Sequence, residues 1–148
     1  MHNKVIIAAA ALLSAGTAFA DADCRFSAQR SAEHSVDGIV RVEIRAGAGS
    51  LRVQGESGLR SVQATGKACA RKERQLERMQ IKLERNGDTL VLDATPVESS
   101  LDPRNWFGDD SPWMDLEIKL PSTLAVEIED GSGDARVSNL ASAKVNDG

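Results

Sequence analysis

Apolar and polar residues alternate with a period of two along most of the chain. The pattern is clear in VRVEI (40–44), IKLER (81–85), LEIKL (116–120) and LAVEI (124–128). Alternation of this kind is typical of β-strands that bury one face and expose the other. Most of the apolar side chains are β-branched or Leu, which suit a pleated sheet. The pattern therefore predicts an all-β fold.

Turn residues separate these runs, and one segment interrupts them. Asn86-Gly87 stands between two alternating runs and predicts a two-residue β-hairpin. Pro121-Ser122 divides the last two strong runs. The segment ARKERQLERM (70–79) has no alternation and is rich in good helix formers, so we expect a short helix near 70–79.

An internal repeat gives the strongest indication of architecture. Residues 42–53 read VEIRAGAGSLRV and residues 126–137 read VEIEDGSGDARV, with seven of the twelve positions identical. Each copy reads as a strand, a G-x-G corner and a second strand. The segment VNDG (145–148) then restates IEDG (128–131), 17 residues later. Units that return at short spacing predict stacked strands, as in a β-helix or β-solenoid.

The chain stops inside the restarted unit. A solenoid normally ends in an atypical capping repeat. We therefore expect that further coils follow Gly148 in the natural protein.

The first twenty residues predict export. Lys4 precedes an apolar run, and Ala18-Phe19-Ala20 provides a small-residue cleavage site. These features are typical of a cleaved secretory signal peptide, and the apolar run is too short to span a bilayer. The expected location is the periplasm or the cell surface, with no transmembrane segment after signal cleavage.

Composition narrows the possible partners. The 148 residues carry a formal net charge of −4, which disfavours a dedicated nucleic-acid binder. Aromatic residues make up only 3% of the chain, as expected where stacked strands bury rows of aliphatic side chains.

Two cysteines, Cys24 and Cys69, remain in the exported part of the chain. An even, small number of cysteines in an oxidising compartment favours a structural disulfide over free thiols. The alternatives, a redox pair or a zinc site, lack a C-x-x-C motif and enough histidines.

The stretch from Leu116 to Leu140, a strand that ends in Leu-Pro and is followed by V-x-I-x-x-G-S-G-D-x-x-V, resembles the bacterial putative-adhesin domain family. The resemblance covers roughly residues 39–148. It implies a right-handed, single-stranded β-helix-like structure in an exported envelope protein, and it carries over no catalytic residue. The expected organisation is a signal peptide over 1–20, an N-terminal extension over 21–38 and a β-repeat domain over 39–148, truncated at its C-terminal end.

The sequence contains few residue patterns that indicate catalysis or metal binding. A hydrolytic triad needs a histidine base, and the exported part of the chain offers only His34. The run DGSGD (130–134) places oxygen ligands alternately, yet Ala135 and Ala141 stand where a calcium loop needs Gly and Glu. We interpret this run as a β-turn, and we expect neither a metal nor a cofactor.

The loop over 96–113, PVESSLDPRNWFGDDSPW, is the most unusual stretch. Its aromatic rings beside carboxylates could bind a glycan, or they could cover one end of the sheet as a satellite core. The candidate ligand-binding residues are Trp106, Phe107, Trp113, Asp109 and Asp110.

Three functions remain open. The leading hypothesis is a non-enzymatic envelope module with a structural or adhesin-like role, whose partner is an envelope glycan or another envelope protein. The second is a glycan-binding module that uses the loop over 96–113. The third, a polysaccharide-active enzyme, would need converging carboxylates such as Asp109, Asp110 and Asp115.

Overall fold

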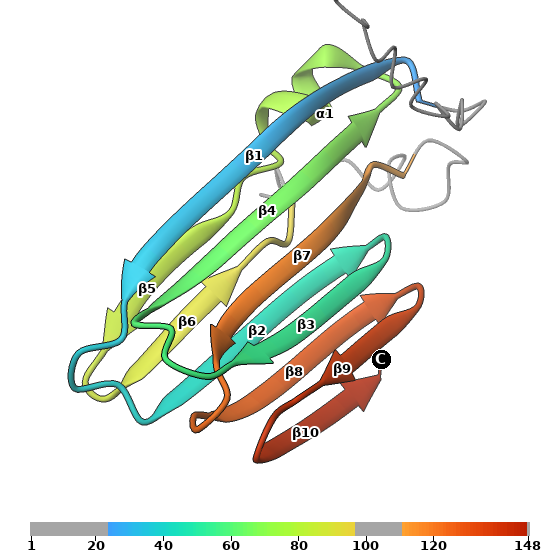
Figure 1. The fold of residues 1–148 in the computed structure, drawn as a ribbon. Coiled ribbons are helices and arrows are strands. Elements are labelled where there is room, and N and C mark those ends of the chain that lie inside the picture. Colours follow the sequence, from blue (N-terminus) through green and yellow to red (C-terminus); the bar gives the residue numbers. More distant parts are fainter. Residues whose placement is uncertain (1–23, 97–110, 148) are drawn as a thin grey trace, which may run out of the picture.

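Two five-stranded sheets make up the protein in a computed structural model that describes residues 24–96 and 111–147. Figure 1 shows the sheets as two layers. Sheet A has the strand order β1 (Phe26–Ser35), β4 (Ser61–Ala70), β7 (Trp113–Pro121), β3 (Leu51–Glu56) and β9 (Ala135–Ser138). Sheet B has the order β10 (Ser142–Asp147), β8 (Ala125–Ser132), β2 (Arg41–Ala48), β6 (Thr89–Asp93) and β5 (Lys82–Asn86). The helix α1 (Glu73–Glu77) packs against β1 and β4.

Both sheets mix parallel and antiparallel strands. The pairs β3–β7, β3–β9, β2–β6, β2–β8 and β8–β10 are parallel. The pairs β1–β4, β4–β7 and β5–β6 are antiparallel. The predicted all-β class is confirmed. The described residues form two mixed sheets, in which antiparallel neighbours extend both sheets beyond the strands of the repeats.

The two sequence repeats pair with each other in the register of their alignment. Val42 lies beside Val126 in sheet B, and Leu51 lies beside Ala135 in sheet A. The 17-residue restart is also structural, because β10 pairs with β8 so that Val145 lies beside Ile128. Equivalent residues of successive units therefore sit next to each other on the same face.

The second glycine of each G-x-G corner makes this stacking possible. Gly49 and Gly133 have φ angles of 123° and 126°, which side-chain-bearing residues rarely adopt. A β-carbon at Gly133 would overlap the carbonyl oxygen of Gly49, and one at Gly49 would overlap that of Met114. The corners can thus approach only where no side chain intervenes.

The core between the sheets is aliphatic. The inward-facing positions of β2, β3, β4, β6, β7 and β8 supply it, and the largest fully buried side chains include Ile44, Leu51, Leu90, Leu92, Ile118, Leu120 and Ile128. None of the described core residues is aromatic. This composition explains the low aromatic content, because Val, Ile and Leu fill the space between the two layers.

The N-terminal segment is an integral edge of sheet A. Residues 26–35 of the expected extension form β1, which pairs with β4 along its whole length. Its inward-facing Arg30 donates from Nε to the carbonyl oxygen of Met79 at 2.8 Å and from a terminal nitrogen to that of Leu76 at 3.2 Å. Because these carbonyls lie at the end of α1, Arg30 fastens the helix beneath β1.

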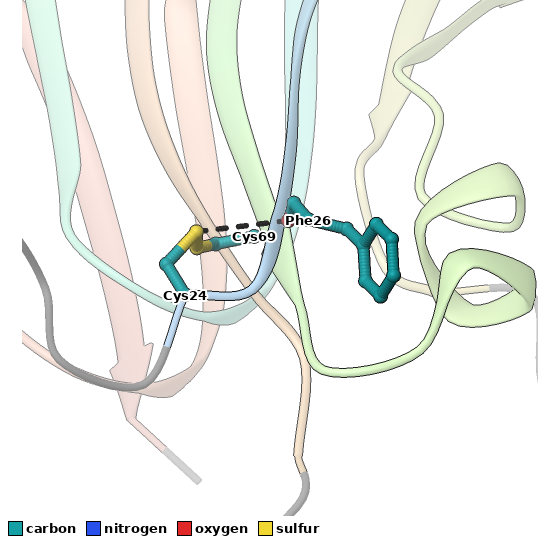
Figure 2. The surroundings of a disulfide bond; sticks show 3 residues. All are labelled: Cys24, Phe26 and Cys69. Carbon is teal, nitrogen blue, oxygen red and sulfur yellow. Dashed lines mark hydrogen bonds between the residues drawn. A yellow bond between two sulfur atoms is a disulfide. The ribbon is translucent and has the colours of Figure 1, made fainter.

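A disulfide joins the start of β1 to the end of β4. It links Cys24 to Cys69, as the sequence predicted, and Cys69 is buried. Figure 2 shows the sulfur atoms on one side of β1 and the Phe26 ring on the other. The disulfide therefore clamps the edge strand where the described chain begins.

Two local predictions hold with shifted bounds. The helix covers only Glu73–Glu77 of the expected 70–79, because β4 continues through Ala70. The hairpin between β5 and β6 is present, but its loop residues are Gly87 and Asp88, since Asn86 pairs with Thr89. Positive φ at Gly87, and not at Asp88, fits a type II′ turn.

Substitution of the two glycines of the second corner tests the stacking. Gly133→Ala should lower the free energy of unfolding by about 3 kcal/mol, because it combines an unfavourable φ with a backbone overlap. Gly131→Ala, whose β-carbon would meet ordinary van der Waals contacts, should change it by less than about 1 kcal/mol. Urea unfolding measures both, and equal effects would contradict the stacked corners.

Removal of the disulfide tests the clamp on β1. Its 45-residue separation predicts that the double variant Cys24→Ser, Cys69→Ser loses about 4 kcal/mol of unfolding free energy. Hydrogen exchange should rise first in β1 and in α1, which Arg30 holds. Uniform loss of protection across both sheets would argue against a local clamp.

Candidate functional site: a groove on the outer face of sheet A

A groove of about 310 Å³ runs across the solvent-facing side of sheet A. The sheet order brings four strands to it, although those strands are distant in sequence. Its polar side chains come from β1, β4, β7 and β3 and from the corner before β3: Gln29, Thr65, Lys67, Asp115, Glu117, Arg52 and Ser50. The groove thus offers amide, hydroxyl, ammonium, guanidinium and carboxylate groups on a rigid support.

The strand register arranges these side chains in rows. One row contains Gln29, Lys67 and Asp115, which are partners across β1, β4 and β7. The next row contains Thr65, Glu117 and Arg52, partners across β4, β7 and β3. Successive rows on one face lie about 7 Å apart along the strands.

Asp115 links β7 to the corner that precedes β3 through hydrogen bonds. Its Oδ1 accepts hydrogen bonds from the backbone N–H and the hydroxyl of Ser50, both at 2.9 Å. Ser50 follows the first G-x-G corner, so this contact ties β7 to the corner that leads into β3. The carboxylate proposed for a hydrolytic set therefore has a structural partner.

Trp113 lies one row beyond the residues that line the groove. It is half-buried and alternates with Asp115 and Glu117 on β7, which places it on the same outer face. It pairs with Cys69, so it lies in the row next to Lys67 and Asp115. An aromatic ring beside groups that form hydrogen bonds is suited to a ligand with both apolar and hydroxyl-rich surfaces.

Of the five residues proposed from the sequence for ligand binding, the structure describes Trp113. Trp106, Phe107, Asp109 and Asp110 lie outside the described residues, as do the predicted signal peptide over 1–20 and most of the loop over 96–113. The only candidate base, His34, contacts the backbone carbonyl of its neighbour Ser35 through Nδ1 at 2.7 Å.

The candidate calcium run forms part of the second corner. The carbonyl oxygens of Ser132 and Asp134 accept hydrogen bonds from Gly49 N–H and Leu51 N–H at 3.2 and 2.9 Å. These bonds stack the second corner on the first. Over residues 24–96 and 111–147, no group of three or more His, Cys, Asp or Glu residues is arranged to hold a metal ion.

The sequence did not reveal the groove as a site. Arg52 is one of the identical positions of the repeat, and Asp115 was noted as a carboxylate. Yet Gln29, Thr65 and Lys67 look like ordinary polar positions of alternating strands. Only the order of the strands in sheet A brings these residues together.

Among the described residues, no helix is long and apolar enough to cross a membrane.

Comparison with known proteins supports the fold. No protein-family model and no curated protein matches the chain. Among solved structures, the chain is similar to a crystal structure of a putative cell adhesion protein from Clostridium sporogenes, with 15% sequence identity and a TM-score of 0.50. The similarity covers 82% of this chain and 57% of that protein, so the chain spans little more than half of its length. At this identity the likeness shows a shared fold.

Proposed function

We propose that the protein is an exported, non-enzymatic envelope module with an adhesin-like role. The outer groove of sheet A, with Trp113 in the adjoining row of the same face, is the observation that carries the proposal. Its polar groups come from strands of a disulfide-clamped sheet, and such a support presents a binding surface with little loss of conformational entropy. The structural neighbour, a protein described as a putative cell adhesion protein, is consistent with this role.

The ligand that suits the groove best is a glycan. A sugar ring has an apolar face, which stacks on an aromatic side chain, and a rim of hydroxyls. Gln29 and Lys67 provide amide and ammonium donors in the row next to Trp113, and Thr65 adds a hydroxyl one row further along. The groove is open and shallow, as expected for a polymer that lies across a surface.

Export is supported by the disulfide, since such bonds persist in oxidising compartments.

The order of the last strands supports the finer resemblance to a β-helix. β8 lies in sheet B, β9 in sheet A and β10 again in sheet B, in parallel register with β8 after 17 residues. We infer that these three strands wind as one solenoid-type coil.

Replacement of Trp113 tests the proposal. The wild-type protein should bind one or more members of a panel of envelope glycans and cell-wall fragments, and Trp113→Ala should weaken that binding about tenfold. Trp113→Phe should restore most of it, because the ring is kept. Isothermal titration measures affinity, and thermal unfolding provides the control.

Two outcomes would contradict the proposal. One is the absence of glycan binding by the wild-type protein across the panel. The other is a large fall in melting temperature of Trp113→Ala with unchanged affinity, which would make Trp113 a structural cover of the disulfide.

A further inference from the structure

The repeat places two arginines side by side on the outer face of sheet A. Arg52 and Arg136 occupy equivalent positions of the two repeats, and both are exposed. β3 and β9 pair in parallel with these two residues in register. Like charges on adjacent strands destabilise a sheet, so this pair carries an electrostatic cost.

The same repeat places two glutamates side by side on the opposite face of the protein. Glu43 and Glu127 are also identical positions, and β2 and β8 hold them in register in sheet B. Here the chain supplies the counter-charges. Arg45 lies 3.7 Å from Glu43, and Lys144 lies 3.7 Å from Glu127. Each carboxylate of the glutamate pair thus has a built-in cationic partner.

The arginine pair has no such partner within the described parts of the chain. Neither Arg52 nor Arg136 takes part in any of the ion pairs among the described residues. Glu117 is in register with Arg52 on its other side, yet the two side chains form no ion pair. Two planar guanidinium groups therefore present their donors to solvent, in a geometry that suits carboxylate, sulfate or phosphate oxygens.

The arginine pair continues the groove. Arg52 lines it directly, and Lys67 adds a third cation from the adjacent row. From the row of Arg52 to that of Trp113 the distance along the strands is about 13 Å, since β7 advances by four residues between Glu117 and Trp113. One ligand of oligosaccharide length could therefore contact the ring at one end and the arginines at the other.

We propose that Arg52 and Arg136 form a subsite for the acidic groups of a glycan, so that the ligand is a carboxylate-bearing polysaccharide. This inference rests on the proposed function, whose glycan it specifies. The chain itself supplies the counter-charges of the glutamate pair. A carboxylate of the ligand supplies the counter-charge of the arginine pair.

The probe is polygalacturonate, compared with its methyl-esterified form, which keeps the sugar backbone and loses the charge. The variants are Arg52→Gln, Arg136→Gln and the double variant. Arg41→Gln is the matched control, because it removes one positive charge from an exposed position on sheet B. Arg52→Lys with Arg136→Lys keeps the charge and removes the planar fork. Thermal unfolding verifies that every variant folds.

The double Gln variant should bind polygalacturonate at least about tenfold more weakly than the wild type, and Arg41→Gln should bind within about twofold of it. The esterified polymer should bind the wild type about as weakly as the acidic polymer binds the double variant. The double Lys variant should lie between these limits, since it keeps the charge.

Several outcomes overturn the inference. Equal effects of the single variants Arg52→Gln and Arg136→Gln and of Arg41→Gln would show that only net charge matters. Equal binding of the acidic and esterified polymers, with loss of both in Trp113→Ala, would keep the glycan site and reject the acidic subsite. Equally tight, arginine-dependent binding to anionic lipid vesicles or DNA would reject a glycan as the specific ligand. Absence of binding to either polymer and to the whole glycan panel would reject the proposed function itself.

Discussion

The structure depends on the close stacking of two corners. Gly49 and Gly133 bring the backbone of one repeat against that of the next. The hydrogen bond from Gly49 N–H to the carbonyl oxygen of Ser132 fixes the register between the two corners. From this contact the parallel strands leave in both directions, β2 beside β8 and β3 beside β9. A shift by one residue would turn every buried Val, Ile and Leu toward solvent, so core and corner specify the same register.

That register also determines the outer surfaces. At outward-facing positions where the two repeats have the same residue, the structure places the two copies side by side on neighbouring strands. The glutamates of sheet B are neutralised by Arg45 and Lys144, whereas the arginines of sheet A face solvent at the edge of a groove. The paired glutamates thus have cationic neighbours within the chain, whereas the paired arginines form no ion pair with the described residues. This difference follows from Arg45, a position at which the two repeats differ, and from Lys144 in the restarted unit.

Much of the fold could be predicted from local patterns. Alternation located β2, β3, β5, β7 and β8, but it did not predict β1 or β4. The hairpin signal was wrong by one residue, and the helix was expected in the right segment because Arg71–Glu77 contains no alternating positions. The sheet order could not be predicted, because alternation does not say which strands pair. The repeats suggested stacked coils, while β1 and β4 add antiparallel strands whose sequences show only a polar and an apolar face. The antiparallel pairing of β5 with β6 agrees with the predicted hairpin. The groove was missed for the same reason, since Gln29, Lys67 and Asp115 meet only through that pairing.

The most direct test of the account is an NMR titration of the isotope-labelled protein with a short acidic oligosaccharide. The account predicts that perturbed signals lie on the outer face of sheet A, at the side-chain Nε–H groups of Arg52 and Arg136, the indole of Trp113 and the intervening rows of β7 and β4. It also predicts unperturbed signals around Glu43 and Glu127. Perturbations centred on sheet B, or none at saturating concentrations of the oligosaccharide, would contradict it.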